Sequence, residues 1–303
     1  MLNRRSFLSA GTLSLGTPTI LQGATAPLAA FGIMADAQYA DVPAEGTRFY
    51  RESIAKLGHA VEDYNRQELA FCVHLGDLID RDWNSLDAIM KPLKACRHPV
   101  RHVLGNHDFD VLDEFKPRIA ERLGMPRRYY HFDRDGFRFM VLDTTDLSLY
   151  GNPAPSREHE AGRAALEKAQ KASLPQAKRW NGGLGLTQML WLDRLCAEAA
   201  LQKLKVILFA HHPVFPVNAL NIWNNGEVLA LAARHSHVVA YFSGHNHEGN
   251  FGEQAGLPFV NLRGMVETPD TTAYAAVTLH ADRIILNGKG REPSRELVFR
   301  TQK

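Results

Sequence analysis

The chain has 303 residues, of which 45% are hydrophobic, and a formal net charge of +2, so it can bury one substantial core. Residues 1–26 contain two arginines and no acid, which leaves the remainder neutral and without the basic footprint of a protein that binds a nucleic-acid polymer. No linker rich in Pro, Gly or Ser divides the chain, and we predict one domain over residues 27–303.

The N-terminal residues 1–26 have the layout of an export signal. A basic start is followed by a mildly apolar stretch and by small residues up to Ala26, after which we expect cleavage. The pair Arg4-Arg5 followed by Ser-Phe-Leu resembles the twin-arginine signal, whose route carries folded proteins. A membrane anchor and a disordered tail are the alternatives, but the segment lacks ~18 consecutive apolar residues. We therefore expect an exported, periplasmic protein with no stable membrane anchor after signal removal.

Short apolar runs alternate with helical patterns along the rest of the chain, which is typical of a sheet whose strands are joined by helices. The runs expected to form central strands are 31–34, 70–75, 100–104, 137–142, 206–209 and 238–242. Apolar residues from Tyr50 to Tyr64 recur at helical spacing, and a second helix is expected after Thr187 as its N-cap.

The C-terminal part changes character, because strand-like runs follow one another with little helix between them. These runs are 258–262, 274–279 and 283–286, and we expect them to complete a second sheet. The predicted fold class is therefore α/β: a layered α/β/β/α sandwich of two mixed sheets flanked by helices.

Residues 143–186 form the longest irregular stretch, with a helical piece over 157–172, and we interpret this stretch as a substrate-facing loop. Its candidate substrate-binding residues are Trp180, Asn181, Gly182 and Gly183. An aromatic ring and an amide could hold a nucleobase, and paired glycines allow the backbone to approach a phosphate. The alternative is that the tryptophan packs under the loop and the glycines only permit turns.

Five of the six central strands end in polar side chains of the kind that bind metals. The endings are Asp36-x-Gln38, Gly76-Asp77, GNHD at 105–108, His211-His212-Pro213 and GHNH at 244–247. Each alone is ordinary turn chemistry, but loops at the carboxyl ends of neighbouring strands share one crevice. Carboxylate, amide oxygen and imidazole together suit Mn²⁺, Fe²⁺ or Zn²⁺, and two such ions bridged by a carboxylate form a clamp for displacement at phosphorus.

The motifs GDxxD at 76–80, GNHD and GHNH, in this order, resemble those of the calcineurin-like metallophosphoesterase superfamily. The resemblance implies one metal ion held by Asp36, Gln38, Asp77 and His247, and a second held by Asp77, Asn106, His211 and His245. It also implies that His107 supports the leaving oxygen and that Asp108 orients its ring. His212, on the opposite side of the chain from His211, is interpreted as structural. Asp80 could hydrogen-bond a ligand loop or cap a helix, and it stays outside the predicted site.

The amide of Gln38 distinguishes this chain within the superfamily, most of which has His at that position. A hard neutral oxygen donor favours Mn²⁺ or Mg²⁺ over Zn²⁺. The blocks that resemble the manganese-dependent ADP-ribose/CDP-alcohol diphosphatases are ADAQYAD, LGDLID and residues 63–65, 180–183 and 261–264.

This resemblance implies an enzyme that cleaves the diphosphate bond of nucleoside-diphosphate-linked compounds to a nucleoside monophosphate and a phosphorylated product. The reaction would use a water activated by two divalent ions, with Mn²⁺ preferred and Fe, Mg or Zn as alternatives. The competing functions are a broader phosphomonoesterase or phosphodiesterase, including one for cyclic nucleotides, and a non-catalytic metal- or nucleotide-binding module. The expected partner is a small phosphate-containing molecule.

Overall fold

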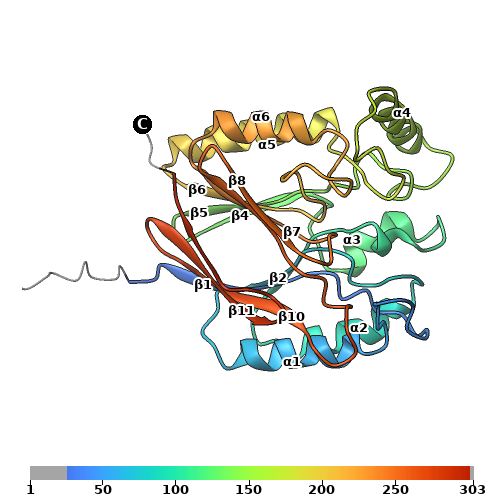
Figure 1. Cartoon of the computed structure of the whole chain (residues 1–303), viewed down its shortest axis with the longest axis horizontal. Helices are drawn as coiled ribbons and strands as arrows, with labels where there is room; N and C mark the ends of the chain where they lie inside the picture. Colours follow the sequence, from blue (N-terminus) through green and yellow to red (C-terminus); the bar gives the residue numbers. More distant parts are fainter. Residues whose placement is uncertain (1–25, 301–303) are drawn as a thin grey trace, which may run out of the picture.

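Two six-stranded mixed sheets pack between two layers of helices, as Figure 1 shows. The computed structural model describes residues 26–300, so the predicted export signal lies outside the described part except for its last residue. This architecture confirms the predicted α/β/β/α sandwich. Among residues 26–300, no helix is both long enough and apolar enough to cross a bilayer.

The first sheet places three parallel strands beside three antiparallel ones. Its strands, in spatial order, are β12 (Arg295–Val298), β11 (Arg283–Gly290), β10 (Ala273–Leu279), β1 (Ala29–Met34), β2 (Cys72–His74) and β3 (Val100–His102). The expectation that the runs 258–262, 274–279 and 283–286 complete the second sheet holds for the first run, which is β9 (Leu257–Asn261), and is wrong for the other two. β10 pairs antiparallel with β1, with Ala29 opposite Leu279, so β10–β12 extend the first sheet. The two edges of β1 are thereby both paired, which matches its buried, uninterrupted apolar run.

The second sheet has a parallel centre and two antiparallel edges. Its strands, in spatial order, are β4 (Tyr130–Arg134), β5 (Phe137–Val141), β6 (Lys205–Phe209), β7 (Val238–Ser243), β9 (Leu257–Asn261) and β8 (Asn250–Gln254). Parallel pairing of β5, β6 and β7 sends their carboxyl ends to one edge of the sheet. Polar residues that follow β6 and β7 therefore meet there.

Helices cover both outer faces of the sandwich. In Figure 1, α1 (Ser53–Asn65) and α2 (Ser85–Lys94) lie on the first sheet, and α5 (Leu186–Leu201) and α6 (Asn225–Arg234) lie on the second. The short α3 (Ile119–Arg122) and α4 (Arg157–Lys171) lie at the right-hand end of the view. α5 begins at Leu186 after Gly185, so the predicted N-cap Thr187 is wrong and lies in the first turn.

Phenylalanine rings join the two sheets in the core. Phe31 of the first sheet lies 5.8 Å from Phe139 and 5.6 Å from Phe209 of the second, between ring centroids, and all three side chains are buried. Such edge-to-face pairs each contribute roughly 0.5–1.5 kcal/mol beyond their buried area. The cluster fixes one sheet against the other and so fixes the loops at their carboxyl ends.

Candidate metal centre

Asp77, directly after β2, lies where loops from both sheets meet. Its Oδ2 is 3.2 Å from Nε2 of His211, which follows β6, and accepts a hydrogen bond of 3.0 Å from Nε2 of Gln38. Its Oδ1 accepts a hydrogen bond of 2.8 Å from the backbone N–H of His107. The structure thus brings the predicted bridging carboxylate into contact with residues from three other loops.

Asp36, the residue predicted to open the first metal site, lies beside this carboxylate. Its Oδ1 is 3.6 Å from Nε2 of His247, and both its oxygens accept from the backbone N–H of His245 at 3.1 Å. On the other side, Nε2 of His211 lies 3.2 Å from Oδ1 of Asn106. All seven predicted metal ligands are therefore gathered at one place.

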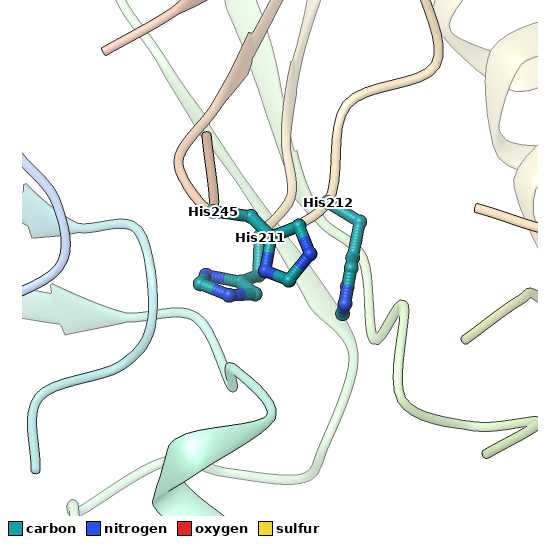
Figure 2. Close-up of side chains that lie close together, drawn as sticks. All are labelled: His211, His212 and His245. Atoms are coloured by element: carbon teal, nitrogen blue, oxygen red, sulfur yellow. The ribbon is translucent and has the colours of Figure 1, made fainter. Parts of the chain in front are cut away.

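Figure 2 shows how three histidine rings from two neighbouring loops approach one another. The rings of His211 and His245 have centroids 5.1 Å apart, and those of His212 and His245 4.1 Å apart. His212 places Nδ1 2.8 Å from Oγ1 of Thr144 and Nε2 3.2 Å from the carbonyl oxygen of Trp180. Both ring nitrogens are thus engaged by the protein, in keeping with the structural role predicted for His212.

The backbone at four of these residues adopts a left-handed conformation that ordinary side chains avoid. The φ angles are 54° at Asp36, 42° at Gln38, 55° at Asp77 and 69° at His245. Non-glycine residues in this region cost of order 1–3 kcal/mol each and persist where the surroundings hold them, typically at functional sites. The fold therefore bears strain to aim these side chains inward.

Glycine is required where a neighbouring loop crosses a buried carboxylate. A Cβ atom on Gly105 would lie 2.1 Å from Oδ1 of Asp77, and one on Gly244 would lie 2.6 Å from Oδ2 of Asp36. These are the first residues of the GNHD and GHNH motifs. Their lack of a side chain lets Asn106 and His245 follow at close range.

The electrostatics of the site are those of buried carboxylates that need a cation. Burial favours the neutral form of Asp77, but His211 and His107 hold its pKa well below the usual range. Burial lowers the pKa of His211, yet Asp77 and Asp36 outweigh it and raise the pKa to about 9. Protonated imidazoles thus balance the acids, and a divalent ion would supply the same positive charge.

The site also fits a metal because it contains a buried oxygen atom without a hydrogen-bond partner. Oε1 of Gln38 is buried and has no hydrogen-bond partner within residues 26–300. Ligand atoms of Asp36, Asp77 and His211 all lie within 4.8 Å of one another. A buried acceptor without a donor is costly, and a hard cation beside it removes that cost.

The ring of His107 contacts a carboxylate other than the predicted one. Its Nδ1 lies 3.0 Å from Oδ1 of Asp80, and the pKa of His107 is raised to about 9, because Asp77 and Asp80 outweigh the effect of burial. Asp108 instead accepts backbone N–H bonds, at 3.0 Å from Asp77 and 2.8 Å from Leu78. The predicted orienting role of Asp108 is therefore wrong: Asp108 holds the Asp77 loop, and Asp80, left outside the predicted site, belongs in it.

Only one of the four predicted substrate-binding residues lines the cavity at the centre. Trp180, half-exposed, forms a wall of a 370 Å³ cavity with Asp77 and His107. Asn181 is wholly buried, where its Nδ2 donates to two backbone carbonyls and its Oδ1 lies 3.0 Å from Nε2 of His245. Asn181 thus positions a predicted ligand and does not face the cavity.

The two glycines of this block are packing residues. A Cβ on Gly182 would lie 2.2 Å from the carbonyl oxygen of Thr144, and the carbonyl of Gly183 accepts a 3.0 Å hydrogen bond from the N–H of Leu147. Both residues are buried against the 144–147 segment. Gly182 and Gly183 do not line the cavity at the metal centre, and the approach of their backbone to a phosphate stays a prediction.

Two further residues of the site carry no motif by which the sequence could indicate them. Oε1 of Glu267 lies 2.7 Å from Nδ1 of His247, which fixes that ring so that Nε2 faces Asp36. Arg48 lines the cavity beside His247. Glu267 comes six residues after the end of β9, a position that reveals its neighbour only in three dimensions.

This fold and this cluster of carboxylates, amides and imidazoles define a metallophosphoesterase. Residues 31–249 match the calcineurin-like phosphoesterase family, and the chain belongs to that family. It is accordingly an enzyme of the dinuclear phosphoester hydrolase class.

Several relatives are similar over nearly the whole chain. The human manganese-dependent ADP-ribose/CDP-alcohol diphosphatase is 32% identical over 333 aligned positions, which cover 94% of this chain and 97% of the human protein. The Arabidopsis thaliana protein of the same name is 31% identical over an alignment that covers 88% of this chain and 96% of the Arabidopsis protein. A crystal structure of a dimetal phosphatase from Danio rerio is 28% identical, covers 91% of this chain and all of that one, and superposes with a TM-score of 0.82.

Proposed function

We propose that the chain is a manganese-dependent hydrolase of the diphosphate bond in nucleoside-diphosphate-linked compounds such as ADP-ribose and CDP-alcohols. The products are a nucleoside monophosphate and a phosphorylated remainder. The observation that carries this proposal is the similarity over 94% of the chain to diphosphatases named for these substrates and for manganese.

The metal ions would be held by the seven gathered residues, with Asp77 between the two sites. Asp36, Gln38, Asp77 and His247 would hold one ion, and Asp77, Asn106, His211 and His245 would hold the other. The unpartnered Oε1 of Gln38 supports a hard ion such as Mn²⁺, since an amide oxygen adds a donor without adding charge. Bound ions would neutralise phosphoryl oxygens and lower the pKa of a water molecule.

The protein's own groups supply the proton and the positioning. His107 lines the cavity with Nδ1 3.0 Å from Oδ1 of Asp80, a carboxylate that favours the protonated ring. A positively charged donor at this place stabilises the oxygen that leaves with the departing phosphate. Trp180, with half of its surface exposed at the cavity wall, offers a ring for a nucleobase.

A substrate panel tests the assignment. Full-length protein is incubated with ADP-ribose, CDP-choline, a cyclic nucleotide and p-nitrophenyl phosphate, each with Mn²⁺, Mg²⁺ or Zn²⁺. We expect AMP and CMP release that is strongest with Mn²⁺, and weak hydrolysis of the monoester. Preference for the cyclic nucleotide or the monoester would refute the diphosphate assignment.

We also propose export through a twin-arginine signal in residues 1–26, on the basis of the sequence pattern alone. The protein is expressed in a bacterium, and the N-terminus of the periplasmic fraction is sequenced. A mature start just after Ala26, lost when Arg4 and Arg5 are replaced by lysine, is the expected result. Full-length protein confined to the cytoplasm would contradict it.

A further inference from the structure

A second, larger cavity opens beside the metal centre. It measures 910 Å³, and four residues line both it and the 370 Å³ cavity: Arg48, Leu220, His245 and His247. A molecule bound at the metal centre can therefore continue into this second cavity.

The second cavity carries a surplus of positive charge. Its lining includes Arg48, Arg263 and Arg291 against the acids Glu248 and Glu267. The carboxylate of Glu267 is engaged by the ring of His247 at 2.7 Å. Three arginines thus line the cavity, and Glu248 is the acid in its lining that is not paired with His247.

Two of the arginines, Arg263 and Arg291, line this cavity together. Burial lowers the pKa of Arg291, Glu267 and Glu292 raise it, and the like charge of Arg263 lowers it. Cations that line one cavity and repel each other favour a bound anion, because an anion relieves their repulsion.

The backbone ties this arrangement to the metal ligands. The N–H of Gly264 donates to the carbonyl oxygen of His247 at 3.0 Å, and the N–H of Val266 donates to that of Asp36 at 2.9 Å. Arg263 precedes this segment, so its position is fixed relative to the metal centre. Nη2 of Arg291 donates to the carbonyl of Gly264 and holds the same segment from the other side.

We propose that Arg263 and Arg291, with Arg48 at the junction of the two cavities, form the subsite for the second phosphate of the substrate. The second phosphate is the one whose phosphorus atom the water does not attack. The inference rests on the proposed diphosphatase function and deepens it, because a phosphomonoester has no group that reaches this subsite. The three arginines would then determine the preference for a diphosphate.

Replacing Arg263 tests the proposal, since its guanidinium makes no hydrogen bond within residues 26–300, whereas Arg291 supports the backbone. In the Mn²⁺-loaded full-length chain, Arg263→Met is expected to lower kcat/KM for ADP-ribose about 10- to 100-fold, mainly through KM. Hydrolysis of p-nitrophenyl phosphate should stay within about twofold. Arg263→Lys should recover part of the loss. The control is Arg194→Met, which removes one charge from an ion pair on α5.

A second readout separates this proposal from the proposed function. Inhibition of p-nitrophenyl phosphate hydrolysis is measured with α,β-methylene-ADP, which has two phosphates, and with AMP, which has one. Arg263→Met should raise the inhibition constant of α,β-methylene-ADP about tenfold or more and leave that of AMP unchanged. Equal changes for both inhibitors, or none, overturn the subsite. A wild-type chain that hydrolyses no diphosphate overturns the proposed function, and the inhibitor comparison still tests the subsite.

Discussion

Asp80→Asn should slow the enzyme in a way that depends on the leaving group. The Asp80 carboxylate is buried and lies 3.0 Å from Nδ1 of His107, so it stabilises the protonated ring. The substitution removes the negative charge of this ion pair, and a close charge pair contributes about 1.5–3 kcal/mol, which corresponds to about 10- to 150-fold in rate. We expect kcat to fall by that factor for ADP-ribose, whose departing phosphate needs protonation or electrostatic support.

The assay compares ADP-ribose with an aryl phosphate that carries a nitrophenolate leaving group, under the same Mn²⁺ concentration. Nitrophenolate leaves without help, so its release should change by less than about threefold. Asp110→Asn is the matched control, because Asp110 is exposed on the same loop region and contacts His107 only through the backbone. Equal losses of kcat on both substrates would contradict this prediction and assign Asp80 a purely structural role.

Three other substitutions give distinct outcomes. Asn181→Leu removes the oxygen that lies 3.0 Å from Nε2 of His245. The variant should have a kcat about tenfold lower for all substrates and an unchanged KM. A rise in KM for nucleotides alone would instead assign Asn181 a role in substrate binding. Burial lowers the pKa of His102 to about 4, below the unfolded value of about 6.5, so the unfolded state binds more protons between these values. The free energy of unfolding, measured with urea, should therefore fall by about 2 kcal/mol more from pH 7.5 to pH 5 in the wild-type chain than in His102→Leu. Equal falls in the two proteins would contradict this. Gly105→Ala places a Cβ 2.1 Å from Oδ1 of Asp77, so it should abolish activity and clearly lower the melting temperature. Gly58→Ala is the control: its Cβ meets open space, so both activity and melting temperature should stay as in the wild type.

The metal ligands could be predicted because each follows an apolar strand, and strand ends in such a sheet converge. Asp36, Asp77 and His211 needed no knowledge of how the strands pair. The pairing itself was out of reach: β10 joins β1 across more than 240 residues, and nothing local in either run specifies the partner. The prediction for the sheet of β10 and β11 is therefore wrong, whereas that for β9 is confirmed.

Side-chain direction explains the errors within the site. Asp108 is the neighbour of His107 in sequence, yet its carboxylate faces the backbone of the Asp77 loop, and Asp80 reaches the ring instead. Asn181 lies in a block that resembles a substrate loop, but its side chain points into the protein. Such orientations depend on packing, which sequence spacing does not encode.

Arg263 shows the same limit for substrate recognition. It lies more than 150 residues from Asn106 in the chain, and the block 261–264, although it resembles the diphosphatases, does not by itself assign a role to this arginine. Its role emerges from its proximity to Arg291 and from a cavity shared with His247. Binding subsites are therefore less accessible to sequence analysis than metal ligands are.

If the residues around Asp77 hold two divalent ions, the number of Mn²⁺ ions bound per chain will show it. Full-length protein is stripped with EDTA, dialysed against Mn²⁺ and analysed for metal per chain, alongside Asp77→Asn with its fold checked by circular dichroism. We expect two Mn²⁺ ions per wild-type chain and at most one in the variant, because the variant lacks the shared carboxylate. A wild-type chain that binds no Mn²⁺, or a variant that still binds two, would contradict it.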